Sequence, residues 1–118
     1  MGDSLCILVR TGPYGTIQAA EAIRHLNGAV ASGVKVTTIL MGDGIHLGKE
    51  GQETETTGWT SLSAALKQTL KGGPQVYAHE PSLQERGISL DELVPGVQTI
   101  DDVEMANILG RSQWLMIF

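Results

Sequence analysis

The first forty residues alternate between an apolar strand, an amphipathic helix and a second strand, and this alternation limits the fold most. Leu5–Val9 is a short, continuous apolar run, which is typical of a strand covered on both faces. From Thr16 to Ser32 apolar residues recur at helical spacing, and Gly33 follows where helices commonly end. The β-branched segment Val34–Leu40 predicts a second strand. Two strands joined in this way are expected to be parallel, with a right-handed crossover.

The rest of the chain continues the alternation. Three further strands are predicted at Gln75–Ala78, Gly96–Ile100 and Trp114–Phe118. Helical segments are predicted near Ile45–Leu47, Ser61–Lys71, Pro81–Arg86, Ser89–Leu93, and from the Asp101 cap to Leu109, with Gly110 as its end. The intervening polar segment, Ile45 to Trp59, is long for a compact domain and fits a lid, an interface segment or a partly ordered loop. The pattern predicts one α/β domain over residues 1–118, a three-layer, flavodoxin-like sandwich with about five mostly parallel strands.

Composition excludes several classes of protein. The net charge is −5 and the eight Lys and Arg residues are scattered, so nucleic acid is not an expected partner. Apolar runs are shorter than the roughly 20 residues that span a bilayer, and the N-terminus does not resemble a signal peptide. Because the chain has one cysteine, it can form no intrachain disulfide and has no pair of cysteines to bind zinc. A cytoplasmic protein without membrane partners, metal or cofactor is the expectation.

Parallel strands bring their C-terminal ends to one edge of the sheet, where open α/β sheets bind ligands. The loops predicted at that edge carry six candidate polar side chains: Thr11, Tyr14, Asp43, His79, Ser82 and Asp101. Gly12–Gly15 leads into a helix and fits both an ordinary glycine turn and an anion-binding loop that includes Tyr14. Asp43 lies between Gly42 and Gly44, which fits a self-bonded turn as well as a ligand contact.

The three histidines lack metal-ligand spacing. His79 follows the third strand and could act as acid, base or ligand, or be structural, and no partner carboxylate is evident in sequence. His25 is expected at the surface or in a helix contact, and His46 lies in the polar loop. Cys6, inside an apolar strand, is predicted to be buried and inert. No serine lies in a recognisable nucleophile motif or beside an evident base.

These features together resemble the DsrE/DsrF group, which includes the TusB, TusC and TusD proteins of the sulfur relay. The landmarks are Gly12–Gly15, Leu40–Gly44, Gly51-Gln52, Ser82–Gly87 and the closing Trp114–Phe118. Their order and spacing carry the resemblance over Ile7 to Phe118. The Ser-Leu-x-Glu-Arg-Gly stretch is most similar to the DsrF/TusC branch. The resemblance adds Gln52 to the expected ligand-binding set of Gly12, Tyr14, Gly15, Asp43, Gly44, His79 and Ser82.

The resemblance implies persulfide transfer by a cysteine just after the third strand, or a non-transferring subunit beside a partner that has it. Here that stretch, Val76–Pro81, contains no thiol, and Ala78 or His79 takes the place. Cys6 is mid-strand and cannot replace it, so no catalytic residue is assigned and persulfide transferase activity is not expected.

Three functions therefore remain open from the sequence. The first is an oligomeric scaffold or binding subunit in intracellular sulfur transfer or oxidation. The second is a small-molecule-binding or enzymatic protein that uses Tyr14, Asp43 and His79, and the third is an interaction protein without a ligand. The resemblance implies a trimeric or hexameric homo-oligomer, or a hetero-oligomer with DsrE-like paralogues, with a sulfur-carrier protein as a further partner.

Overall fold

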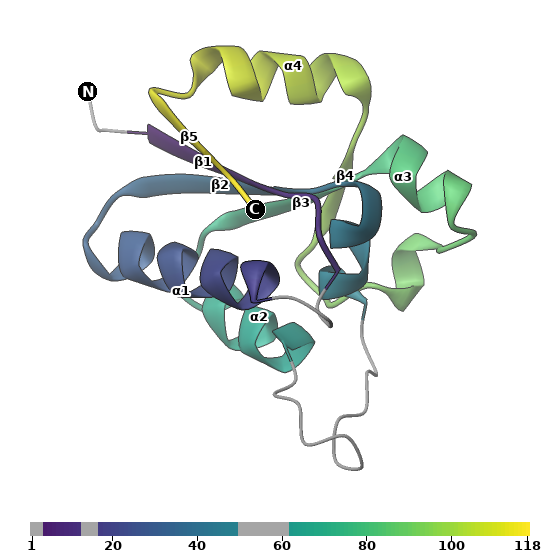
Figure 1. Cartoon of the computed structure of the whole chain (residues 1–118), viewed down its shortest axis with the longest axis horizontal. Helices are drawn as coiled ribbons and strands as arrows, with labels where there is room; N and C mark the ends of the chain where they lie inside the picture. The colour runs from purple at the N-terminus through teal and green to yellow at the C-terminus, as the bar shows by residue number, and fades with distance from the viewer. Residues whose placement is uncertain (1–3, 13–16, 50–61) are drawn as a thin grey trace.

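The computed structural model describes residues 4–12, 17–49 and 62–118, and within them it contains a five-stranded sheet (Figure 1). The strands are β1 (Ser4–Val9), β2 (Lys35–Leu40), β3 (Gln75–His79), β4 (Gln98–Ile100) and β5 (Trp114–Ile117). All neighbouring pairs are parallel, and the order across the sheet is β4-β3-β2-β1-β5. The predicted parallel α/β fold is confirmed.

Helices cover both faces of this sheet. Figure 1 shows α1 (Gln18–Ala31) and α2 (Leu62–Leu70) on one face and α4 (Asp102–Arg111) on the other. The short helix α3 (Glu80–Glu85) and the 3-10 segments η1 (Gly42–Gly48) and η2 (Leu90–Glu92) complete the elements. The strand order explains the layers: β1 to β4 advance in one direction, whereas β5 returns to the far side of β1. A right-handed crossover then places α4 opposite α1 and α2.

Two aliphatic clusters fill the space on either side of the sheet. The larger one joins α1, α2 and η1 to the sheet and includes Ile7, Leu26, Leu40 and Leu66. The smaller one lies beneath α4 and consists of Cys6, Leu8, Ile39, Ile100 and Ile108. Cys6 is fully buried in it, as predicted from its place in an apolar strand.

Two predictions about individual segments need correction, and a third is confirmed. Gly110 does not end α4, because the helix continues to Arg111. Ile17, one of the apolar residues at helical spacing between Thr16 and Ser32, is exposed, because it is the N-cap residue and lies outside the helix it precedes. The helical segment predicted near Ile45–Leu47 is confirmed: η1 runs to Gly48 and buries Ile45 and Leu47 against the larger cluster. The remainder of the predicted polar loop, residues 50–61, lies outside the described residues.

Thr38 offers a test of the core, because its buried hydroxyl has no hydrogen-bond partner. Thr38→Val keeps the shape and removes this unsatisfied group, so we expect stabilisation by about 1 kcal/mol in urea unfolding. Thr69→Val is the matched control, because the Thr69 hydroxyl lies 2.6 Å from Asn27 Oδ1 and 3.0 Å from the Ala65 carbonyl oxygen. The control should lose stability, and equal responses of the two variants would contradict the assignment.

Candidate functional site

The C-terminal ends of the strands bring together the described residues predicted for the site. Gly12 follows β1, Asp43 and Gly44 begin η1 after β2, His79 ends β3, and Ser82 lies in α3. A side chain added at Gly12 would lie 3.7 Å from the carbonyl oxygen of Asp43, so the loops after β1 and β2 adjoin. The predicted common edge is therefore present. Tyr14, Gly15 and Gln52 lie outside the described residues.

His79 is hydrogen-bonded through both ring nitrogens. Its Nδ1 lies 2.7 Å from Ser82 Oγ, and its Nε2 lies 2.6 Å from Asp102 Oδ1 in the first turn of α4. Ser82 Oγ also accepts a hydrogen bond from the Gly42 backbone N–H at 2.9 Å. This His79 network therefore joins the ends of β2, β3, α3 and α4, which are far apart in sequence.

The hydrogen bonds of His79 are all satisfied by the neutral tautomer that carries its proton on Nε2. A carboxylate only accepts hydrogen bonds, so Nε2–H donates to Asp102. Ser82 Oγ, which accepts from Gly42, then donates its own proton to Nδ1. With a neutral imidazole, every donor in the series of hydrogen bonds that links Gly42, Ser82, His79 and Asp102 has an acceptor.

Three expectations about this site are corrected. The sequence showed no carboxylate for His79, but Asp102 supplies one from 23 residues away. It also showed no serine beside a base, whereas Ser82 and His79 are in direct contact. His79 is itself the last residue of β3 and is only 8% exposed, rather than a loop residue. The predicted capping role of Asp101 is confirmed, because its side chain accepts a hydrogen bond from the Glu104 backbone N–H at 2.8 Å.

The Ser82–His79–Asp102 arrangement lacks the accessibility of a nucleophilic triad. Ser82 is 4% exposed, and its hydroxyl is held between the Gly42 N–H and the imidazole. A serine nucleophile must reach a substrate carbonyl, which this burial prevents. Asp102 differs, because 72% of its side chain is exposed. The network is therefore buried at its serine end and open to solvent at its carboxylate end.

Arg86 and Asp43 form an ion pair beside this network. Arg86 Nη2 donates to Asp43 Oδ1 at 3.1 Å, and Nη1 donates to the Ser82 carbonyl oxygen at 3.3 Å. Asp43 thus contacts α3, and Arg86 joins the turn after β2 to the helix after β3. Arg86 was not among the site residues predicted from the sequence, although it lies in the Ser82–Gly87 stretch that carried the resemblance.

Two glycines allow the turn after β2 to approach β1. Gly42 has a left-handed φ of 55°, which glycine adopts without strain. At Gly44 a side-chain Cβ would lie only 2.1 Å from the Val9 carbonyl oxygen. Any other residue at Gly44 would force the turn after β2 or the end of β1 to shift.

Comparisons with known proteins assign the chain to a family. The family model described as DsrE/DsrF-like matches residues 3–118. The chain belongs to the DsrE/DsrF-like family.

Relatives and solved structures agree with this assignment. A protein named TusC homolog from Vibrio vulnificus strain YJ016 is 28% identical over 117 residues, which cover 98% of this chain and 99% of that protein. The intracellular sulfur oxidation protein DsrF of Allochromatium vinosum is 33% identical over 89 residues, covering 74% of this chain and 65% of that protein. The crystal structure of YchN from E. coli superposes with a TM-score of 0.88 at 22% identity, covering 98% and 99% of the two chains, which shows a shared fold.

Cys6 is the one cysteine in the sequence of this DsrE/DsrF-like chain, and its surroundings disfavour reactions of its thiol. Burial raises the pKa of the Cys6 thiol, and a hydrogen bond with Ser112 opposes that shift only in part. Sulfur chemistry proceeds through the thiolate, so a fully buried thiol with a raised pKa is poorly reactive. Cys6 also lies in the middle of β1, away from the edge that carries His79.

Two further properties of this DsrE/DsrF-like chain concern metals and membranes. Over the described ranges, no three His, Cys, Asp or Glu side chains are grouped as metal ligands. In the same ranges, no helix has both the length and the apolar character required to cross a bilayer.

Proposed function

We propose that the chain is a non-catalytic, oligomeric binding or scaffold subunit in intracellular sulfur transfer or oxidation. Family membership and the names of the TusC and DsrF relatives support the pathway. One observation supports the non-catalytic role: of the two residues that take the place of the sulfur-carrying cysteine, Ala78 has no reactive group and His79 is buried at the end of β3 and hydrogen-bonded through both ring nitrogens. Neither residue binds sulfur covalently, and the His79 network stabilises the edge to which partners would bind.

The proposal predicts that folded protein gains no sulfur from a low-molecular-weight persulfide donor such as glutathione persulfide. The only thiol is that of Cys6, which is fully buried, and thiol exchange requires access by the incoming sulfur. Native mass spectrometry measures the result directly as the absence of a one-sulfur mass increase. The same spectrum should show an assembly of several 12.6 kDa chains.

Gln84→Cys supplies the matched control, because Gln84 is an exposed residue of α3. This variant should acquire sulfur under identical conditions, which shows that the donor is competent. Sulfur on Cys6 of the folded wild-type protein would overturn the non-catalytic role, and a monomeric mass would overturn the oligomeric one.

The alternative function, a small-molecule pocket at this edge, depends on the exposed Asp102 carboxylate. A ligand that reaches the His79 ring must displace Asp102 from Nε2, because the other nitrogen is occupied by buried Ser82. Asp43 is likewise held by Arg86. Both contacts favour the scaffold proposal over a pocket that uses these side chains.

A further inference from the structure

A second site is indicated on the opposite half of the sheet, where α4 leaves the starts of the strands uncovered. A cavity of about 610 Å³ lies there. Its floor is formed by Ser4 of β1, Lys35 and Thr37 of β2, and Gln75 and Tyr77 of β3. These residues share the face of the sheet beneath α4, because Thr37 pairs with Gln75, and Tyr77 packs against the cluster under that helix. We call this cavity the α4-face pocket.

The end of α4 forms the wall of the α4-face pocket. Ile108, Arg111 and Ser112 line that side. The Ser112 hydroxyl donates to the Ile108 carbonyl oxygen at 2.7 Å, which fixes its position. Arg111 therefore lines the same cavity as Lys35.

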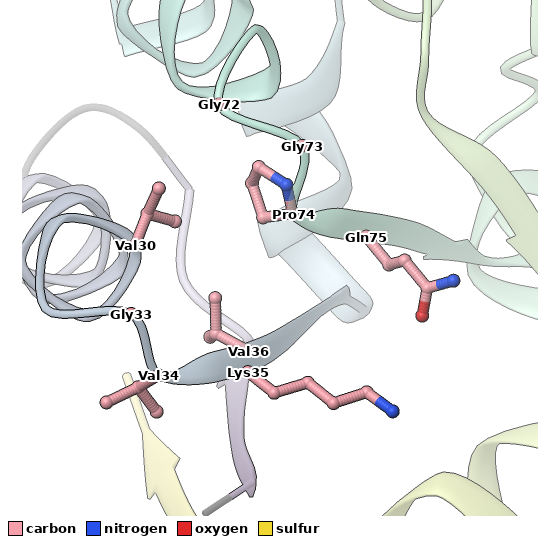
Figure 2. A pocket seen from close by; sticks show the side chains of 9 residues that line it. All are labelled: Val30, Gly33, Val34, Lys35, Val36, Gly72, Gly73, Pro74 and Gln75. Atoms are coloured by element: carbon pink, nitrogen blue, oxygen red, sulfur yellow. The ribbon is translucent and has the colours of Figure 1, made fainter. Parts of the chain in front are cut away.

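The α4-face pocket adjoins a second hollow at the N-terminal ends of β2 and β3. Lys35 and Gln75 line both cavities. Figure 2 shows that hollow, of about 440 Å³, with Val30, Val36 and Pro74 around it. In that view the Lys35 and Gln75 side chains extend away from Val30 and Pro74. Their polar ends thus lie away from Val30 and Pro74, and both residues also line the α4-face pocket.

The polar groups of the α4-face pocket are mostly donors without partners. In the described ranges, the side chains of Lys35, Thr37, Gln75, Tyr77 and Arg111 form no hydrogen bond or ion pair with the protein. No Asp or Glu is among the described residues that line the pocket, although the whole chain has 13 acidic and eight basic residues. Lys and Arg are protonated at neutral pH, so two positive charges face one cavity without compensation.

Unpaired cations and hydroxyl or amide donors are the chemistry that recognises a tetrahedral oxyanion. The volume exceeds that of an inorganic ion and falls in the range of small-molecule sites. Tyr77 and Ile108 provide apolar surface for an organic group. We propose that the α4-face pocket binds a small organic phosphate or sulfonate, with the oxyanion at Lys35 and Arg111 and the organic group against Tyr77. This site does not depend on the sulfur-transfer proposal.

The test uses phenyl phosphate as the probe, with benzenesulfonate, inorganic phosphate and phenol as comparisons. Calorimetry measures affinity, and amide chemical shifts in NMR locate the site. We expect saturable binding of phenyl phosphate, shifts confined to β2, β3 and the end of α4, and weaker binding of phenol and inorganic phosphate. Comparable binding of benzenesulfonate would support recognition of the shared oxyanion, whereas weaker binding would indicate a requirement for the phosphate dianion.

Three exposed cations provide matched variants. Lys35→Gln and Arg111→Gln should each weaken phenyl phosphate binding about tenfold, the effect of one lost charge-assisted hydrogen bond. Lys71→Gln makes the same change in net charge at an exposed residue outside the pocket and should have less than about a twofold effect. Three results would each overturn the proposal. They are an equal loss of phenyl phosphate affinity in Lys71→Gln, binding of phenol as tight as that of phenyl phosphate, and no binding because another copy covers the pocket.

Discussion

Gly44→Ala is expected to destabilise the protein by roughly 3 kcal/mol in equilibrium urea unfolding. The added methyl would lie 2.1 Å from the Val9 carbonyl oxygen and 2.7 Å from its carbon. Both atoms belong to the backbone of a central strand, so no side-chain rotation relieves the contact. Either the turn after β2 or the end of β1 must shift, and the His79 network shifts with it because Gly42 donates to Ser82.

Gly110→Ala is the control for this prediction. A Cβ at Gly110 meets no atom within 4 Å, and Gly110 lies within α4. Alanine is the better helix former, so this variant should gain about 0.5–1 kcal/mol. Equal stability of the Gly44→Ala and wild-type proteins would show that the turn does not approach β1 as closely as described.

The sequence predicted the direction of the strands but could not predict their order. Each strand is a short apolar or β-branched run, and helical segments between them require parallel pairing. Nothing in Trp114–Ile117 distinguishes a strand beside β1 from one beside β4, since in either position it would be an edge strand of the sheet. The order decides the layers, so the separate position of α4, and with it the α4-face pocket, was outside the reach of sequence reasoning.

The location of the site was predictable because parallel strands all end at one edge of the sheet, but the hydrogen bonds and the ion pair within the site were not predictable. His79 and Ser82 were placed at the edge because they follow a predicted strand. Asp101 rather than Asp102 was predicted at this edge because Asp101 directly follows the predicted strand Gly96–Ile100. The first turn of α4 directs Asp101 toward the Glu104 N–H and Asp102 toward His79, and this difference between adjacent side chains depends on the helix orientation. Arg86 was missed because its partner, Asp43, is 43 residues away.

Ser82→Ala tests whether the His79 network stabilises the edge of the sheet. The substitution removes the partner of both the Gly42 N–H and the His79 Nδ1. Because His79 is buried, water does not readily replace the lost group, and we expect a loss of about 2 kcal/mol in urea unfolding. Ser32→Ala, at the exposed C-cap of α1 where no side-chain bond is formed, should change stability by less than about 0.5 kcal/mol.

Asp102→Asn distinguishes the two ends of the network. The asparagine carbonyl still accepts from His79 Nε2–H, and the exposed side chain remains hydrated, so we expect a loss below about 1 kcal/mol. The expected loss of stability is larger at buried Ser82 than at exposed Asp102, because an unsatisfied group costs most where solvent cannot reach it. If the exposed aspartate contributed more than the buried serine, the network would be maintained by its charge, and the edge would have to be interpreted as a binding site for a ligand of His79.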